Sequence, residues 1–291
     1  MKVTQLRISR RSVTVAAALV GMVSLAIGAH AALNKRALDV AKAVAAEQGA
    51  EAAKGPSRVA LVIGNGHYPD ANAPLAQPIN DARALTASLR RNGFDVDVVE
   101  DASRDDMRRA VDRLKSRVKP GSVVMLFFGG YGVQIGTQSY MIPVDAAIWK
   151  EADVRRDGLS IESVLDVMKE QGARAKLVVV DASRRNPYER RFRKFSHGLG
   201  PIAAPENALI LSSATPGKVA DDSESANSVL MTELLGHINA NVDAKTAADA
   251  ETIFNKTRLA ISRASEGGQV PVVSSTLSED IRFAIAEKAG S

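Results

Sequence analysis

The sequence predicts a three-layer α/β domain in which a mostly parallel sheet carries helices on both faces. Short, nearly continuous apolar runs such as VALVIG (59–64) and VVMLFF (123–128) are typical of strands buried on both faces of a parallel sheet. Amphipathic segments with helical spacing separate these runs. Right-handed crossover connections between parallel strands then place helices on both sides of the sheet.

Each element follows from its own pattern. The segment 80–93 is expected to be a helix, with Asn80 as its N-cap and Gly93 as its end. FDVDVV (94–99) alternates as a half-exposed strand does. Ser103 caps the next helix, and Asp106 makes an imperfect capping box with it. The remaining elements are strands at 123–128, 176–182 and 208–214, and helices at 160–172, near 228–239 and at about 250–264.

Composition excludes several classes of chemistry. The chain has 291 residues, 45% of them hydrophobic and 24% charged, which is enough for one large packed domain. It contains no cysteine. This excludes disulfides, thiolate zinc sites, lipid attachment through an N-terminal cysteine and any cysteine nucleophile.

Residues 1–31 resemble an export signal. Four basic residues precede an uncharged, mostly apolar run, and Ala29-His30-Ala31 fits the small-x-small cleavage pattern. Ser9-Arg10-Arg11 is a weak twin-arginine signal. The sequence therefore predicts a periplasmic or extracellular protein. The alternative is an uncleaved N-terminal anchor that leaves the domain outside the cytoplasm, although the apolar run is short for a membrane span.

The basic balance of the chain follows from this signal. Cleavage removes four basic residues and no acidic one, which leaves 34 basic against 33 acidic side chains and a net charge of +1 in place of +5. Nucleic acid is therefore not an expected partner. Residues 32–57, rich in Ala, Lys and Glu, are expected to be a helical spacer or a disordered linker, and residues 58–285 to form one domain.

Four small, polar, glycine-bearing segments follow predicted strands: GNGHY (64–68), GGYG (129–132), DASRRN (181–186) and SSATPG (212–217). In an open parallel sheet, sites gather beyond the carboxyl ends of the strands. Two of these ends each display one side chain in the predicted fold, Tyr131 and Ser183. A functional site is expected there.

The order of these motifs resembles the caspase-like, metacaspase-related peptidase family. The matching segments are RVALVIGN (58–65), INDARAL (79–85), LFFGGYG (126–132), SYMIPVD (139–145), KLVVVDASRRNP (176–187), ATPGKVA (214–220) and QVP (269–271). The resemblance implies the caspase-like fold over about residues 57–283. It also implies that Tyr131 occupies the position of the family's general-base histidine and Ser183 that of its nucleophilic cysteine.

These two substitutions argue against efficient proteolysis. Tyrosine has a reference pKa near 10, so only about one in a thousand is phenolate at pH 7, and a serine hydroxyl needs a good base. The resemblance therefore favours a catalytically silent pseudopeptidase that serves as a binding or regulatory module. A weak serine hydrolase that uses Ser183, with His67 or His197 as its base, is the alternative. A structural envelope protein is a third hypothesis.

Asp181 and Asn65 are the predicted substrate-binding residues. In relatives that cleave after Arg or Lys, the resemblance implies that the aspartate matching Asp181 helps to form a pocket for the basic side chain. Asp181 could equally cap the turn that follows it. Asp221 and Asp222 could add acidity to the same groove. The basic segment 184–194 could be a partner-binding loop, a processing loop or a solvated loop.

A peptide or protein with an Arg or Lys side chain is therefore the expected partner. Contact with a membrane is expected only through an uncleaved N-terminal segment, and the oligomeric state stays open. No cofactor and no metal site are expected, because no phosphate-binding loop, dinucleotide fingerprint or metal-ligand spacing is present.

Overall fold

The computed structural model describes residues 56–69, 75–182, 199–213, 225–240, 248–264 and 269–283, all within one compact unit, Pro56–Ser291. The predicted export signal and nearly all of the predicted spacer therefore lie outside the described residues. In the part of the chain that is described, no helix is both long enough and apolar enough to span a membrane.

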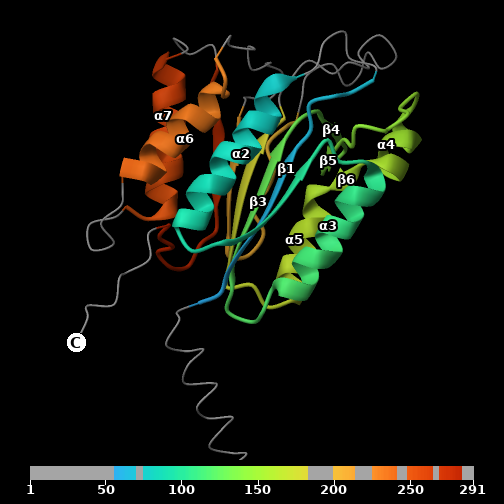
Figure 1. Ribbon diagram of the computed structural model, residues 1–291. Helices are drawn as coiled ribbons and strands as arrows, with labels where there is room; N and C mark the ends of the chain where they lie inside the picture. The colour runs from blue at the N-terminus through green and yellow to red at the C-terminus, as the bar shows by residue number, and fades with distance from the viewer. Residues whose placement is uncertain are drawn as a thin grey trace, which may run out of the picture. The chain divides into compact units, whose positions relative to one another are not determined.

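A six-stranded sheet in the order β2-β1-β3-β7-β8-β9 forms the centre of the molecule (Figure 1). The first five strands are parallel, and β9 pairs antiparallel with β8. The predicted mostly parallel sheet is confirmed. Its strands are β1 (Arg58–Gly64), β2 (Asp95–Glu100), β3 (Val123–Gly129), β7 (Ala175–Asp181), β8 (Ala208–Ser212) and β9 (Val272–Ser275).

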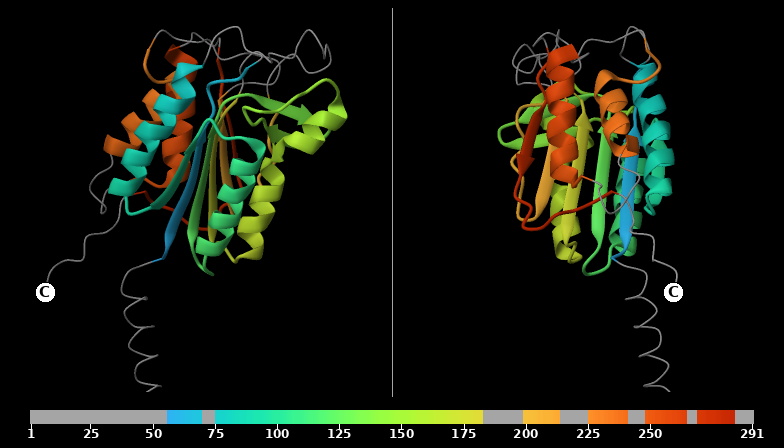
Figure 2. Two further views of the ribbon diagram at one scale, coloured as in Figure 1. Left: turned by 45° about the vertical axis from the view of Figure 1, so that its right-hand side comes forward. Right: turned by 90° about the vertical axis from the view of Figure 1, so that its left-hand side faces the viewer.

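Helices cover both faces of this sheet, as predicted (Figure 2). On one face lie α2 (Ala76–Arg91), α6 (Val229–Ala240) and α7 (Ala250–Ala264), and on the other lie α3 (Arg104–Arg117) and α5 (Ile161–Glu170). Successive strand residues point to opposite faces. In β3, Met125 and Phe127 therefore enter the core under α2 and α6, whereas Leu126 and Phe128 enter the core under α3 and α5.

A second, three-stranded antiparallel sheet follows β3 and was not predicted. It consists of β4 (Gly132–Ile135), β5 (Gln138–Met141) and β6 (Leu159–Ser160), with α4 (Glu151–Asp157) between β5 and β6. These segments are too short to show a clear period in the sequence. Ser160 ends β6 and caps α5, since its side chain accepts a hydrogen bond from the backbone N–H of Ser163.

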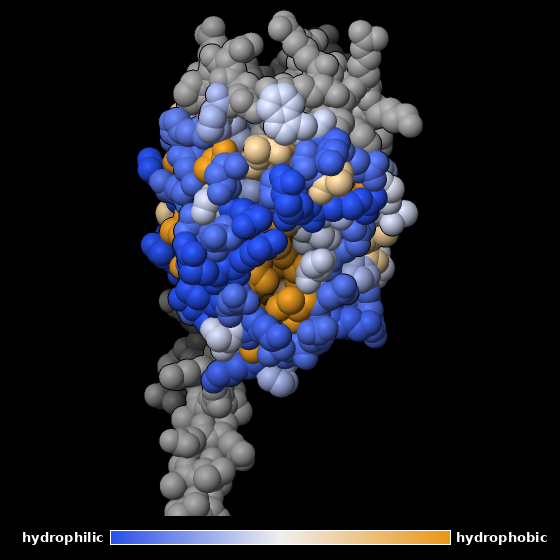
Figure 3. Space-filling view, turned by 90° about the vertical axis from the view of Figure 1, so that its right-hand side faces the viewer, coloured by the Kyte–Doolittle hydropathy of each residue, from blue (hydrophilic) through white to orange (hydrophobic). Residues whose placement is uncertain are grey.

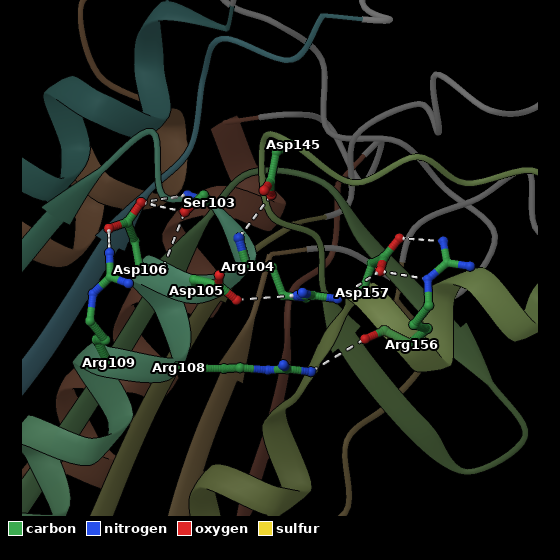
Figure 4. Close-up of polar contacts among 9 residues, drawn as sticks. All are labelled: Ser103, Arg104, Asp105, Asp106, Arg108, Arg109, Asp145, Arg156 and Asp157. Carbon is green, nitrogen blue, oxygen red and sulfur yellow. Dashed lines mark hydrogen bonds and ion pairs between the residues drawn. The ribbon is translucent and has the colours of Figure 1, made fainter.

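Charged contacts join α3 to α4 (Figure 4). The backbone N–H of Arg104 donates to Asp145 at 2.8 Å, and the Arg104 guanidinium lies 3.5 Å from Asp157. Arg156 bonds both carboxylate oxygens of Asp157, at 2.8 and 2.7 Å, and Arg108 donates to the backbone oxygen of Arg156. This network fixes the second sheet and its helix beside α3.

The face formed by α3, α4 and α5 is largely hydrophilic, with an apolar strip at its centre (Figure 3). Val111 of α3 and Leu159 of β6 are partly buried against the core cluster under α3 and α5. Arginine side chains of α3 account for part of the polar surroundings, since Arg104, Arg109 and Arg113 are partly or well exposed.

The edge strand β2 carries acidic side chains that pair with the flanking helices. Asp97 accepts from Arg113 of α3 at 2.7 Å, and Glu100 binds Arg83 of α2 in a bidentate pair at 2.7 and 2.6 Å. The alternation of the strand sends these two carboxylates to opposite faces. Both helix layers are thereby tied to the edge of the sheet.

The start of α2 differs from the prediction. The helix begins at Ala76, with Leu75 at the N-cap position, and not after Asn80. Pro78 reads as a helix breaker in the sequence, yet it lies in the first turn, where its missing N–H has no helical acceptor to lose. The predicted capping box of Ser103 and Asp106 is confirmed. Gly93, with φ of 75°, follows the C-cap of α2, as predicted.

Candidate functional site

Three strand ends lie in one row at the carboxyl edge of the sheet. The register places Gly64 of β1 beside Gly129 of β3, and Gly129 beside Asp181 of β7. Two of the three positions carry no side chain. The carboxylate of Asp181 is therefore the one side chain that this row of three residues contributes.

The first turn of α2 lies directly over this row. A Cβ atom at Gly64 would collide with the backbone oxygen of Pro78, and one at Gly129 would lie 3.2 Å from Cβ of Pro78. Glycine at both positions therefore lets the helix approach the strand ends closely. Asp81 follows Pro78 by one helical turn and is fully buried between α2 and the sheet.

Asp81 and Asp181 form a buried acidic pair. Asp181 belongs to the same alternation as Leu177 and Val179, which face α2 and α6, so its side chain enters the layer that holds Asp81. Asp181 is 2% exposed and Asp81 0% exposed. The Oδ2 atom of each has no hydrogen-bond partner among the described residues. Buried carboxylate oxygens are normally bonded, so the pair is a departure that calls for a functional explanation.

Burial, and then the negative charge of Asp181, raise the pKa of Asp81 to about 6. Hydrogen bonds from Asn227 and Ser228 oppose this shift: Asn227 Nδ2 donates to Oδ1 at 2.8 Å and the backbone N–H of Ser228 donates to the same oxygen at 3.0 Å. Both donors precede α6. The site is thus built from α2, β7 and the start of α6.

Sequence reasoning singled out Asp181 but not Asp81. Asp81 lies in INDARAL, four residues before the buried Leu85 and seven before the buried Ser88. An acid on the core-facing stripe of a helix was the available signal.

Tyr131 does not display its side chain at the rim, so that prediction was wrong. The residue is 7% exposed, and its ring centroid lies 4.5 Å from that of Tyr68. The Tyr131 backbone N–H donates to Tyr68 Oη at 3.1 Å, and Tyr68 Oη donates to the Ile142 oxygen at 2.9 Å. A phenol ring gains more from burial than a small polar side chain does, so it packs into the core of the second sheet.

Asn65, predicted to bind substrate, is fully buried and bonded to the backbone. Its Oδ1 accepts from the N–H of Ala102 at 2.8 Å, and its Nδ2 donates to the oxygen of Ile142 at 3.2 Å. The amide joins the end of β1 to the segment after β2 and to the segment after β5. We therefore assign Asn65 a structural role, because its bonds leave the side chain inside the protein.

His67 is exposed and pairs with Asp101. Its Nδ1 lies 2.6 Å from Asp101 Oδ2, and Asp101 Oδ1 accepts from the backbone N–H groups of Gly66 and His67, both at 2.9 Å. Partial burial raises the pKa of Asp101, but these hydrogen bonds and the nearby His67 outweigh it and leave the pKa below its usual value. Asp101 follows β2, so the imidazole is held on the side of β1 away from β7.

The remaining predicted site residues lie outside the described part of the chain: Ser183, His197, Asp221, Asp222 and the basic segment 184–194. The residue before Ser183, Ala182, is 1% exposed. Within the described ranges, no group of three or more His, Cys, Asp or Glu side chains could hold a metal ion.

Comparison with known proteins addresses the family. A family model described as the caspase domain, Peptidase_C14, matches residues 57–282, which is most of the chain. The chain belongs to the caspase-domain family. The six-stranded, mainly parallel sheet with helices on both faces agrees with the caspase-like fold that the motifs implied.

Two mammalian proteins with similarity to this caspase domain were also found. The chain is 31% identical over 133 residues to the human mucosa-associated lymphoid tissue lymphoma translocation protein 1, and 30% identical over 133 residues to its mouse homologue. Each match covers 45% of this chain but only 16% of the relative. The similarity therefore concerns one part of much longer proteins.

Proposed function

We propose that the chain is a catalytically silent caspase-domain protein, a pseudopeptidase that binds a basic side chain of a peptide or protein partner. The buried acidic pair of Asp81 and Asp181 carries this proposal. The two carboxylates each have an oxygen without a partner among the described residues, and one of them lies at the strand end that leads to Ser183, so they offer a guanidinium or ammonium group the acceptors that it needs.

The silent character is supported by the residues at the two catalytic positions. The family motifs match Tyr131 to the general-base histidine and Ser183 to the cysteine nucleophile, and the chain has no cysteine. Tyr131 is packed against Tyr68 in the core and has only a weakly basic phenol. Loss of a nucleophile and its base removes several orders of magnitude of rate and leaves only what binding supplies.

Export is the second part of the proposal. The pattern of residues 1–31 supports a periplasmic or extracellular location, or an N-terminal anchor that leaves the domain outside the cytoplasm. Identification of the N-terminal peptide of the mature protein tests it. A mature chain that begins at Ala32 supports cleavage, and one that retains Lys2 contradicts it.

The main rival is a serine hydrolase that uses Ser183. The pair of His67 and Asp101 is the observation in its favour, since a carboxylate that orients an imidazole is the arrangement of a catalytic base. The sheet order weighs against it. Asp101, which holds the imidazole, follows β2, and Asp181 ends β7, three strands away at about 4.8 Å per strand, or about 14 Å in all.

A fluorogenic panel and a binding measurement separate these functions. The panel carries Arg, Lys or Asp before the scissile bond, and Ser183→Ala is assayed beside the wild type. We expect no turnover in either protein, with binding of the arginine peptide to both. Turnover that disappears in Ser183→Ala would establish the hydrolase, and absence of both binding and turnover from a folded protein would leave a structural role.

The variant Asp181→Asn tests the recognised group. Loss of one charged acceptor should raise the dissociation constant of the arginine peptide about ten- to hundredfold, because a hydrogen bond to a charged group contributes about 1.5–3 kcal/mol. Asp97→Asn is the matched control, because Asp97 lies on the edge strand and pairs with Arg113. Unchanged binding in Asp181→Asn would remove this residue from the site.

A further inference from the structure

We propose that at acidic pH the ligand-free protein holds a proton between Asp81 and Asp181, and that a basic side chain binds by displacing this proton, so that recognition strengthens as the pH rises. This inference rests on the proposed binding function and adds its regulation. The proton leaves for solvent, and the positive charge of the ligand takes its place between the two carboxylates.

Geometry is the first support. Asp81 and Asp181 are 0% and 2% exposed, and each has an oxygen without a partner among the described residues. Two negative charges at such a buried position repel each other and lose their hydration, so one of the two acids keeps its proton to a higher pH than an exposed aspartate does when no ligand is present. The raised pKa of Asp81, caused first by burial and then by the charge of Asp181, agrees with this argument.

The hydrogen bonds indicate where the proton is held. Asp81 Oδ1 already accepts two bonds, from Asn227 and from the backbone of Ser228. Its Oδ2 accepts none from the described residues and is therefore the atom that can carry the proton. A neutral carboxylic acid at this position keeps both Oδ1 bonds. Protonation therefore removes the charge repulsion without breaking the contact to the start of α6.

The elements packed against α2 bring no cation to the pair from the described residues. The last residues of β1 and β3 carry no titratable side chain, and Arg58, at the start of β1, binds the oxygen of Phe283. On the α2 face of β2, Glu100 is paired with Arg83. On α6, Glu233 and His237 lie five and nine residues after Ser228.

Two further groups have to be separated in a titration. Lys176, at the other end of β7 from Asp181, has a pKa lowered by burial. His67 lies on the same rim of the sheet as the acidic pair, is held by Asp101, and can itself gain or lose a proton, so it needs its own control variant.

The expected change of affinity with pH follows from the pKa of Asp81. With a midpoint near 6, the dissociation constant of an arginine ligand should be about tenfold larger at pH 5 than at pH 7, and nearly constant from pH 7 to 8. Binding should release about 0.9 proton at pH 5, about half a proton at pH 6 and almost none at pH 8. A neutral ligand of the same shape should show neither effect.

Titration calorimetry of the full-length chain measures this release. The probe is acetyl-Ala-Ala-Arg amide, and its citrulline counterpart is the uncharged isostere. Each titration is run at pH 5, 6, 7 and 8 in two buffers of different ionisation enthalpy. The difference in binding enthalpy between the two buffers gives the number of protons that binding releases. The same series with His67→Gln should show unchanged proton release.

Carbon-13 NMR of the ligand-free chain supplies an independent measurement. The Asp81 carboxyl signal is assigned by its absence from Asp81→Asn. Its titration in the ligand-free protein should give a pKa of about 6, and this pKa should fall when the arginine peptide is saturating. Asp101→Asn provides a second assignment control on the same rim.

The outcomes separate the two proposals. Binding of the arginine peptide without proton release, with an Asp81 signal that titrates near 4, would overturn this inference and leave the proposed function intact. Loss of the release in His67→Gln would assign the proton to His67 and also overturn it. Equal binding of the citrulline peptide, or no binding at any pH, would overturn the proposed function and this inference together.

Discussion

The ring of Tyr131 packs against the ring of Tyr68 with centroids 4.5 Å apart and an interplanar angle of 58°. The hydroxyl of Tyr68 bonds the backbone of Tyr131 and of Ile142, which belong to the two ends of the β4–β5 hairpin. A Cβ atom at Gly130 would lie 2.6 Å from that hydroxyl, so the turn before Tyr131 is shaped around it. The position matched to the family's histidine is thus part of the packing of the second sheet.

The substitution Tyr68→Phe tests this arrangement. It removes the hydroxyl that bonds both the buried N–H of Tyr131 and the oxygen of Ile142, which keeps its bond from Asn65, so we expect the free energy of unfolding to fall by about 1–3 kcal/mol in urea denaturation. Tyr140→Phe is the matched control, because the Tyr140 hydroxyl bonds the exposed side chain of Gln138. Equal losses in the two variants would contradict a special role for Tyr68.

The stability of the protein should depend on pH through Asp81. Its pKa is about 6 in the folded protein and near 3.9 in an unfolded chain, so the folded state binds more protons between these values. The contribution of Asp81 is therefore complete below pH 4 and is lost as the pH rises to 6, a change on the order of 3 kcal/mol. Asp81→Asn should remove this loss. In urea denaturation its free energy of unfolding should exceed that of the wild type at pH 7, but not at pH 4. Parallel profiles for the two proteins would contradict the prediction.

Two glycines should respond to alanine in opposite directions. Gly64→Ala introduces a Cβ atom against the Pro78 oxygen and the Ala82 side chain, and should cost about 1–3 kcal/mol as α2 is pushed from the sheet. Gly236→Ala, in α6, meets no atom within 4 Å and should stabilise the protein by about 0.5–1 kcal/mol. Thermal denaturation of both variants checks the pair, and an unaffected Gly64→Ala would argue against the close approach of α2.

The structural role of Asn65 predicts a loss of stability. Asn65→Ala leaves the buried N–H of Ala102 without its acceptor and removes one of the two hydrogen bonds to the Ile142 oxygen, which keeps the bond from Tyr68; it should cost about 1–3 kcal/mol. Asn80→Ala, which removes an exposed bond to the Ala226 oxygen, should change stability by less than about 0.5 kcal/mol. If Asn65→Ala instead keeps full stability but loses the arginine peptide, the residue belongs to the binding site.

The central sheet was predictable because its strands are long apolar runs. Strands such as β3 are buried along their whole length, and the helices between them repeat their apolar residues at helical spacing. The second sheet was not predictable. Two-residue and four-residue strands such as β6 and β4 carry too few residues for a period, and their pairing depends on the Tyr68 and Tyr131 packing around them.

The position of Asp181 in the sheet was predictable from the sequence, but that of Asp81 was not. The strand-end rule located Asp181, because parallel strands bring their carboxyl ends to one edge. It could not locate Asp81, whose role depends on the close approach of α2 over Gly64 and Gly129. The same rule wrongly predicted an exposed Tyr131 side chain, because the sequence of a turn does not show whether an aromatic ring faces the solvent or the core.

The paired acids of β2 affect how copies of this protein meet one another. An edge strand exposes unused backbone N–H and C=O groups, which can recruit a strand from another molecule. Here Asp97 and Glu100 hold arginines from α3 and α2 beside that edge, so an incoming strand has to displace two charged pairs before it can form a ladder. The contacts that tie the helices to the sheet thereby also oppose growth of the sheet into a fibre from this side. At high protein concentration, β2 presents neighbouring molecules with charged pairs and not with a flat, uncharged edge.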